Sequence, residues 1–180
     1  SYINKIYEMT SVGRMFHNFY PSRIEIPEQP KRTQFLRNVT ESVLKLRETF
    51  LAGDYEYFII IESDVIPPVD LLKRFDRDVE LLNIIDQSWG SLGGIYYKGF
   101  HDYTLGGIHK THHTLSGCTL YKRELIQKYP FRWSEDNLGA FPDAWISYDA
   151  GQEFGFYNDH DIVCDHLENP KTLTRYSKPL

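Results

Sequence analysis

The spacing of hydrophobic positions predicts two long amphipathic helices in the first half of the chain. Between Thr33 and Ala52 the apolar residues recur every three or four positions, and Gly53 follows as a stop signal. The same spacing predicts a second helix after Pro67-Pro68, with Pro68 in its first turn. The apolar positions are Phe35, Val39, Val43, Leu46 and Phe50 in the first helix, and Leu72, Phe75, Val79 and Leu82 in the second.

Short apolar segments between turn-forming residues predict the strands. The clearest of them, Tyr57 to Glu62, is an unbroken apolar run that ends in a carboxylate, as expected for a strand buried inside a parallel sheet. Strands that alternate with helices indicate an α/β sandwich whose mixed central sheet is mostly parallel. The other predicted strands are 1–9, 23–26, 91–97, 114–121 and 162–164, and the other predicted helices are 122–128 and 143–154.

Composition limits the class of protein further. The chain has 180 residues without a repeat or a linker, so a single domain over residues 1–180 is expected. Its net charge of −5 argues against a general nucleic-acid partner, which would require a basic face. No apolar run is long enough to cross a bilayer, and Cys118 and Cys164 are too few for a disulfide framework, so a cytoplasmic protein is expected. Whether the two cysteines pair is left open.

An acidic pair stands at the carboxyl end of the clearest strand, where Ser63 separates Glu62 from Asp64. Open α/β sheets bind ligands at that edge, and two carboxylates on alternate residues can share a hard divalent cation. The alternative is that both acids cap the following helix, because Asp is common near helix N-termini.

Further motifs follow this acidic pair in a definite order. The chain carries Val65-x-Pro67-Pro68 after the acids, then a strand with Gly93-Gly94, Leu115-Ser116-Gly117-Cys118, Pro142-Asp143 and finally His166, with Arg37 in the first helix. Over roughly residues 33–167 this order resembles the glycosyltransferases of the GT-A fold, and the short chain resembles their compact members carried by archaeal viruses. Those enzymes move a sugar from a nucleotide sugar. The resemblance therefore implies a GT-A-like, Rossmann-type α/β/α sandwich.

The resemblance implies a divalent metal site beside a donor site. Asp64 and His166 would hold the ion, Mn or Mg, and the imidazole favours Mn, with Asp165 as the alternative ligand. The ion would neutralise the charge that builds on the departing nucleoside diphosphate. Glu62 replaces the aspartate usual in this family and would contact the ribose or a metal-bound water. The residues that the resemblance places at the nucleotide sugar are Glu62, Ser63, Arg37, Ser116 and Gly117.

The resemblance also implies a catalytic carboxylate, Asp143. In inverting members this acid is the general base that takes the proton from the acceptor hydroxyl as it attacks the anomeric carbon. Asp149 is the reserve candidate and Glu135-Asp136 comes third. The plainer alternative is that Asp143 is an ordinary residue of the first helical turn. Trp145 beside it would either support a sugar ring or be buried in the core.

Four histidines, His101, His109, His112 and His113, gather in the Gly-rich stretch 99–114, which is predicted to be a loop. Such a cluster raises the question of zinc, but the spacing has no matching cysteine pair. We therefore expect either a mobile lid over the donor or acceptor, or a plain surface loop.

The leading hypothesis is a metal-dependent glycosyltransferase that transfers a sugar, with inversion, from a nucleotide-diphosphate sugar to an acceptor hydroxyl. The acceptor would be a saccharide, a protein or a lipid-linked group, and the setting the cytoplasm, that of the host if the chain is viral. A nucleotidyltransferase is an alternative, although Ser11-Val12-Gly13-Arg14 is a weak version of the phosphate loop it would need. A carbohydrate-binding module without catalysis, on the same fold, is another.

Overall fold

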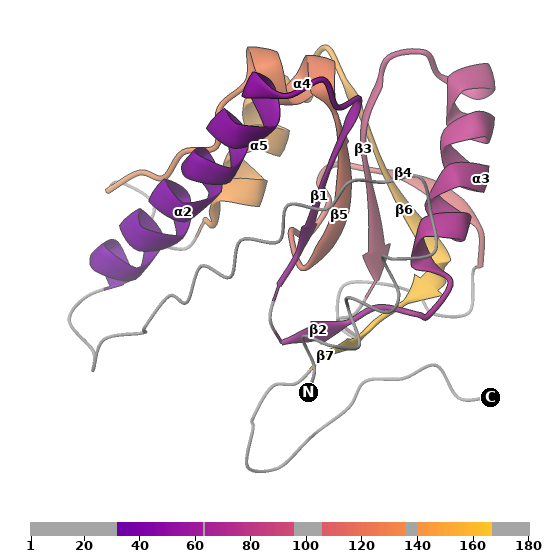
Figure 1. Ribbon diagram of the computed structural model, residues 1–180, viewed down its shortest axis with the longest axis horizontal. Helices are drawn as coiled ribbons and strands as arrows, with labels where there is room; N and C mark the ends of the chain where they lie inside the picture. The colour runs from indigo at the N-terminus through magenta and orange to yellow at the C-terminus, as the bar shows by residue number, and fades with distance from the viewer. Residues whose placement is uncertain (1–31, 63, 96–105, 136–139, 167–180) are drawn as a thin grey trace.

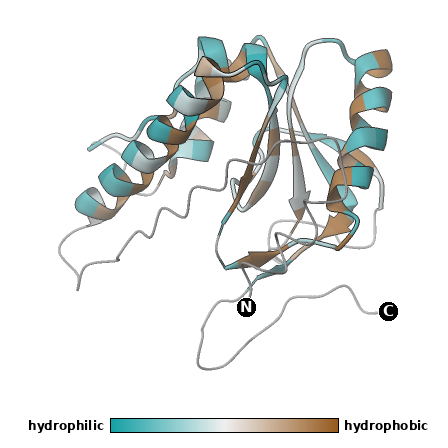
Figure 2. Cartoon of the chain, viewed as in Figure 1, coloured by the Kyte–Doolittle hydropathy of each residue, from teal (hydrophilic) through white to brown (hydrophobic). Residues whose placement is uncertain are grey.

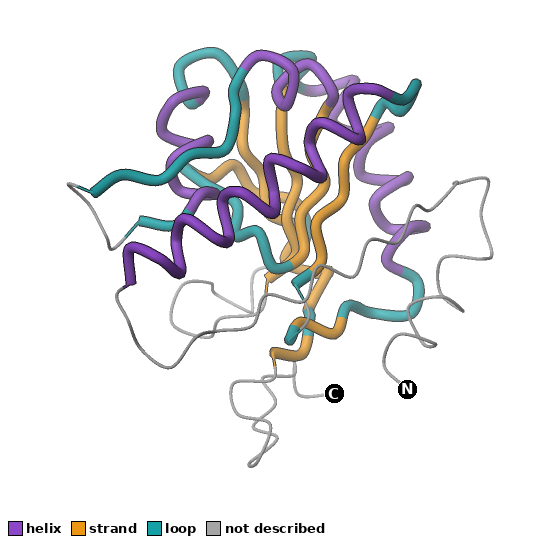
Figure 3. The backbone as a smooth tube through the Cα atoms, turned by 60° about the vertical axis from the view of Figure 1, so that its left-hand side comes forward, coloured by secondary structure: helices purple, strands orange, loops and turns teal. Residues whose placement is uncertain are grey.

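The computed structural model describes residues 32–62, 64–95, 106–135 and 140–166. They form a five-stranded sheet with helices on both faces (Figure 1). Its strands lie in the order β1-β5-β3-β6-β4, and a second, two-stranded sheet pairs β2 with β7. Helix α3 covers one face of the large sheet, whereas α2, α4 and α5 lie on the other (Figures 1 and 3). The strands are β1 (Tyr57–Ile61), β2 (Val65–Ile66), β3 (Trp89–Ile95), β4 (Ile108–Thr111), β5 (Cys118–Lys122), β6 (Gly155–Val163) and β7 (Asp165–His166). The helices are α2 (Arg32–Ala52), α3 (Leu71–Ile85), α4 (Arg123–Lys128) and α5 (Pro142–Ala150).

The strand pairings of the large sheet are mostly antiparallel, which corrects the expectation of a mostly parallel sheet. β5 lies between β1 and β3 and runs opposite to both, and β4 runs opposite to β6. The parallel pair is β3 with β6. A strand covered by helices on both faces has the same apolar composition whichever way its neighbour runs, so the pattern could not decide the direction. The described residues form a mixed α/β fold.

Strand β1 is half-buried, although its apolar run predicted a fully buried strand. Phe58 is buried, whereas Tyr57 and the isoleucines at 59–61 remain partly exposed. Within the described residues β1 lies at the edge of the sheet, while β3, at its centre, is buried throughout. The position of a strand in the sheet therefore decides its burial here, because β1 is entirely apolar yet half-buried, whereas β3 is fully buried although it contains three glycines and a serine.

Two hydrophobic clusters, one on each face of the sheet, stabilise the fold, and the brown apolar residues in Figure 2 follow the strands and the inner sides of the helices. On the α3 face, Phe75 and Leu82 belong to the same cluster as Trp89 of β3. On the other face, the ring of Tyr121 in β5 meets the edge of Phe131 at 5.6 Å between ring centroids. Each fully buried side chain of this size contributes about 2 kcal/mol to folding.

Cys118 and Cys164 are both buried in the cluster on the α3 face, where they are free thiols. A hydrogen bond with the Cys164 side chain, together with burial, raises the pKa of Cys118 well above its usual value. The fold therefore brings the two cysteines together without a disulfide, which answers the question that the sequence left open.

Helix α2 confirms the predicted helix over 33–52, and Arg123 completes its C-terminal end. The Arg123 guanidinium donates hydrogen bonds to the carbonyl oxygens of Leu51, Gly53 and Tyr55 at 2.9 to 3.0 Å. The Leu51 carbonyl group lies in the last turn of α2, where a helix leaves its acceptors without intrahelical partners, and the other two follow directly after the helix. Helix α3 also forms as predicted, but it begins at Leu71, so Pro68 precedes the helix and does not occupy its first turn.

The Gly-rich stretch 99–114 contains a strand, β4, where a loop was predicted. Gly106 and Gly107 adopt φ angles of 60° and 72°, a region that favours glycine, and the chain then pairs with β6. The Gly107 N–H donates to Asp161 Oδ2, and the Gly107 carbonyl oxygen accepts from His160 N–H. The turn thus depends on partners in β6, which is also longer than the predicted 162–164. His101 lies outside the described residues.

A pair of buried carboxyl groups joins α3 to β6. Asp78 of α3 and Asp159 of β6 are 1% and 0% exposed, and the Arg77 guanidinium donates to both, at 2.7 Å to Asp78 Oδ1 and 3.0 Å to Asp159 Oδ2. Burial, together with the neighbouring Asp159 carboxyl group, raises the pKa of Asp78 to about 7. Asp78 is therefore protonated in the folded protein under conditions where an unfolded chain would release the proton.

The stability of the protein should consequently fall as the pH rises from about 4 to about 7, because folding at these pH values requires Asp78 to take up a proton. Asp78→Asn supplies a neutral donor towards Asp159 and should remove this dependence, raising the free energy of unfolding at about pH 8 by on the order of 2 kcal/mol. Urea unfolding across the pH range measures both effects. The exposed Asp76→Asn on the same helix is the matched control. If the free energy of unfolding of Asp78→Asn depended on pH as in the unaltered protein, the raised pKa of Asp78 would be contradicted.

Candidate functional site

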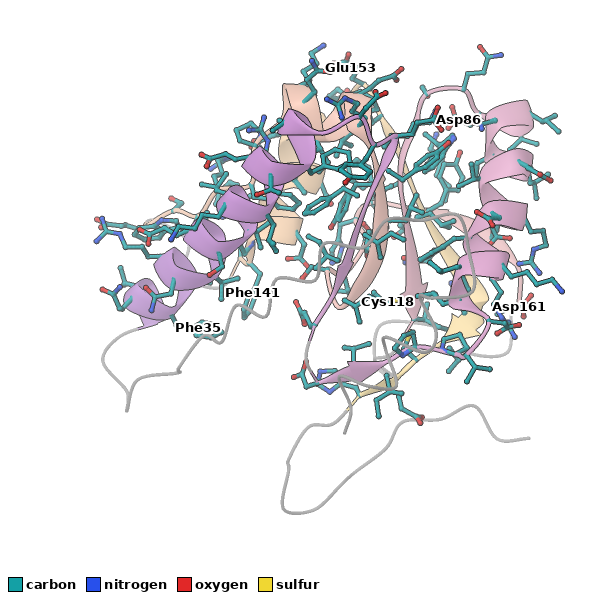
Figure 4. All side chains as sticks on the ribbon, in the orientation of Figure 1. Phe35, Asp86, Cys118, Phe141, Glu153 and Asp161 are labelled. Atoms are coloured by element: carbon teal, nitrogen blue, oxygen red, sulfur yellow. The ribbon has the colours of Figure 1, made fainter. Side chains whose placement is uncertain are left out.

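The predicted site residues Glu62, Asp64, Ser116, Asp143 and His166 lie at one end of the large sheet. Glu62 directly follows β1, Asp64 precedes β2, Ser116 precedes β5, Asp143 lies in the first turn of α5, and His166 ends β7. The small sheet of β2 and β7 lies below the end of β1 in Figure 1. Cys118, the first residue of β5, marks this end in Figure 4, and Asp86 marks the opposite end.

Asp64 and His166 are brought together by the pairing of β2 with β7, which sets Val65 opposite His166. The distance from His166 Nε2 to Asp64 Oδ2 is 3.6 Å. The imidazole is 8% exposed and the carboxylate 48% exposed, so one side of the pair is open to solvent. Because side chains alternate along a strand, Asp165 lies on the opposite face of β7 from His166.

Glu62 and Asp143 are linked through Ser116. The Ser116 hydroxyl donates to Glu62 Oε1 at 2.6 Å, and the Ser116 main-chain N–H donates to Asp143 Oδ2 at 3.0 Å. The Glu62 N–H in turn donates to the Gly117 carbonyl oxygen at 3.0 Å. Burial raises the pKa of Glu62, the hydrogen bond from Ser116 lowers it, and the negative charges of Asp64 and Asp143 raise it further.

Asp143 is held at the beginning of α5. Pro142 occupies the first turn, where its missing N–H costs nothing, and the helix follows the extended Phe141. Asp143 is 6% exposed, and its Oδ1 atom accepts the Ala144 N–H at 2.9 Å. Asp143 is thus a residue of the first helical turn, as the plainer interpretation holds, and Oδ1 contacts that turn. Its other oxygen, Oδ2, faces Ser116.

The helix-capping alternative for Glu62 and Asp64 is wrong. The residue that precedes α3 as its N-cap is Asp70, well beyond the acidic pair. Asp64 faces His166 and Glu62 faces Ser116, so both carboxylates are directed to the site and not to the helix.

Two other predicted residues are not brought to this site. Arg37 lies exposed on α2, where it pairs with Glu41 at 3.8 Å and lies 6.0 Å from the ring centroid of Trp133. Asp149, the reserve base, accepts two hydrogen bonds from Arg132, at 2.6 and 2.8 Å. A bidentate ion pair of this kind holds a carboxylate in one orientation, so Asp149 is committed to Arg132.

The remaining candidate residues lie away from this site or outside the described residues. The Arg132 guanidinium stacks 3.7 Å from the ring centroid of Trp145, so one face of that ring is covered. Glu135 is exposed, and Ser63 and Asp136 lie outside the described residues. His109 is a β4 residue whose ring packs against His160 at 4.7 Å between centroids, which corrects its expected place in a loop.

The geometry fits a divalent cation held at two points. In the part of the chain that the structure describes, no three His, Cys, Asp or Glu side chains are grouped to hold a metal ion. Asp64 and His166, however, converge with one side open to solvent. Mg and chemically similar ions are commonly bound by one or two protein ligands, with substrate phosphates and water completing the coordination. An imidazole nitrogen beside a carboxylate oxygen favours Mn.

Sequence reasoning missed the main-chain groups of this site. The Ser116 N–H and the Gly117 carbonyl oxygen contact Asp143 and Glu62, and neither group has a side-chain signature. It also missed β2, although Val65 and Ile66 between Asp64 and Pro67 are a short β-branched pair that could have indicated a strand.

The comparisons with known proteins concern the fold. No family model and no curated protein sequence matches this chain. Among solved structures, A197 from STIV is similar, with a TM-score of 0.50 over 73% of this chain and 68% of that chain at 17% identity. At this identity the likeness supports a shared fold and nothing about activity. None of the described helices combines the length and the apolar character needed to cross a membrane.

The pairing of Asp64 with His166 generates a direct expectation for metal binding. Asp64→Ala and His166→Ala should each weaken Mn²⁺ binding roughly tenfold or more, since each removes one of two converging ligands. Electron paramagnetic resonance of free Mn²⁺ during titration measures this loss. The exposed His112→Ala is the matched control and should bind like the unaltered protein. Equal Mn²⁺ affinity in all four proteins would exclude a site at Asp64 and His166.

Proposed function

We propose that this protein is a metal-dependent glycosyltransferase of GT-A-like architecture, which moves a sugar from a nucleotide-diphosphate sugar to an acceptor hydroxyl with inversion. The observation that supports it is the meeting of Asp64 with His166, beside the chain of contacts from Glu62 through Ser116 to Asp143. The order of motifs along the chain, which resembles that of GT-A glycosyltransferases, includes each of these residues. The fold likeness to A197 from STIV is consistent with the proposal but does not carry it.

The donor half of the reaction is assigned to the residues between β1 and β7. Asp64 and His166 hold the divalent ion, which when bound neutralises the charge of the departing diphosphate. Glu62 lies beside them, oriented by the Ser116 hydroxyl, and accepts hydrogen bonds from the ribose. The Ser116-Gly117 turn leaves room for the backbone to approach the donor closely.

The acceptor half is assigned to Asp143. Its carboxylate takes the proton of the acceptor hydroxyl while the hydroxyl oxygen bonds to the anomeric carbon and the bond from that carbon to the diphosphate breaks. The hydrogen bond from the Ser116 N–H fixes one of its oxygens beside the donor. Asp149 is less suited to this role, because its carboxylate is paired with the charged guanidinium of Arg132, whereas Asp143 accepts neutral main-chain N–H groups. A saccharide, protein or lipid-linked acceptor in the cytoplasm belongs to the same proposal.

Titration calorimetry with UDP, GDP and their sugar conjugates, with and without Mn²⁺, tests the donor assignment. We expect one nucleotide to bind in an ion-dependent way and Asp64→Ala to abolish that binding, because the carboxylate holds the ion against the diphosphate. Undiminished binding by Asp64→Ala would remove the assignment. Binding of a saccharide without affinity for any nucleotide would favour the carbohydrate-binding module, and release of pyrophosphate from a nucleoside triphosphate would favour the nucleotidyltransferase.

Asp143→Asn separates binding from transfer. The amide keeps the shape of the carboxylate but cannot take a proton, so donor binding should persist while transfer falls by roughly 10²- to 10⁴-fold. Product formation from the donor identified by calorimetry, followed by chromatography, measures the loss. Asp149→Asn is the comparison and should retain transfer. The base would have to be reassigned if Asp143→Asn transferred sugar normally or if Asp149→Asn were the inactive variant.

A further inference from the structure

Ser116 contacts both the half-buried carboxyl group of Glu62 and the buried carboxylate of Asp143, and it does so through two different atoms. Its hydroxyl donates a hydrogen bond to Glu62 Oε1 at 2.6 Å, and its main-chain N–H donates one to Asp143 Oδ2 at 3.0 Å. A serine hydroxyl has a single proton to donate, so the bond to Glu62 uses it fully. The two contacts can therefore be altered separately, because a side-chain substitution leaves the main-chain N–H in place.

The turn that carries Ser116 is fixed by contacts other than those of the Ser116 side chain. The Thr119 hydroxyl donates to the Leu115 carbonyl oxygen at 2.5 Å, and the Glu62 N–H donates to the Gly117 carbonyl oxygen at 3.0 Å. The adjoining register sets Ile61 opposite Cys118. Removal of the Ser116 hydroxyl should thus leave the turn in place and free only the Glu62 carboxyl group.

We infer that Ser116 is a positioning residue for both halves of the site: its hydroxyl orients the donor-side carboxyl group of Glu62, and its main-chain N–H orients the acceptor-side carboxylate of Asp143. The inference rests on the proposed function and adds to it a residue that acts through two others. Because the turn is fixed independently of the Ser116 side chain, the hydroxyl governs donor binding while the N–H keeps Asp143 in place.

The matched control is a second serine–carboxylate contact of the same length at the other end of the sheet. The Ser88 hydroxyl donates to Asp86 Oδ1 at 2.6 Å, and Figure 4 shows Asp86 far from Cys118, which follows the Ser116 turn. Ser88→Ala therefore loses an equivalent hydrogen bond outside the site.

Steady-state kinetics with the donor found by calorimetry tests the inference. We expect Ser116→Ala to raise the donor KM roughly tenfold with kcat largely kept, because the hydrogen bond to Glu62 is lost while the N–H still holds Asp143. Ser116→Thr retains the hydroxyl and should restore KM to within about threefold of the unaltered protein. Ser88→Ala should leave both constants unchanged. Unaltered constants in Ser116→Ala, or Ser116→Thr as impaired as Ser116→Ala, would overturn the positioning role.

A double-mutant cycle in urea unfolding tests the contact without any substrate. Ser116→Ala and Glu62→Ala should be non-additive by roughly tenfold in the unfolding equilibrium constant, because each removes the same hydrogen bond. Asp143→Asn should have the same effect in the unaltered protein and in Ser116→Ala, since the N–H remains. Additive effects of Ser116→Ala and Glu62→Ala would overturn the link. If the unaltered protein bound no nucleotide while this cycle remained non-additive, the proposed function would fail and the link would stand.

Discussion

The antiparallel pairing of β1 with β5 is the constraint on which the site depends. Its register sets Ile61 opposite Cys118, and the next pair in the ladder joins the Glu62 N–H to the Gly117 carbonyl oxygen. A shift by one residue would move Cys118 and Leu120 out of the cluster on the α3 face, so burial fixes the register. Ser116 is consequently held beside Glu62, and the contact with Asp143 follows from the place where α5 begins.

Two pairs of carboxyl groups in this fold are linked by partners of different charge. Asp78 and Asp159 share the guanidinium of Arg77 and link α3 to β6. Glu62 and Asp143 share the neutral Ser116, which supplies hydrogen bonds but no charge. Burial raises the pKa of Glu62, and the nearby negative charges of Asp64 and Asp143 raise it further, against the lowering effect of the Ser116 hydrogen bond. A divalent ion bound at the neighbouring Asp64 and His166 would offset that charge, whereas the pair bridged by Arg77 is a structural link between elements.

The fold of this protein is shared with a known structure, whereas its candidate site is defined by particular side chains. The likeness to A197 from STIV, at 17% identity, concerns the arrangement of helices and strands. Unrelated activities occur on the same fold, so the proposal for this protein rests on particular side chains and their separations. The residues involved lie on segments far apart in the sequence, and the two sheets bring them to one end of the molecule. Regular elements hold two of them in place, with Asp143 anchored by α5 and His166 by the pairing of β7 with β2.

The sequence by itself determined the helices α2 and α3, the strand β1 and the position of the acidic pair after it, because these depend on local periodicity and residue type. Only the tertiary structure decided that β5 runs opposite to its neighbours, that β4 is a strand and that Asp149 belongs to Arg132. It also decided the 3.6 Å approach of His166 to Asp64 and the role of the Ser116 N–H. Local patterns record which positions are buried, whereas strand direction, partner choice and main-chain hydrogen bonds arise from contacts between distant segments.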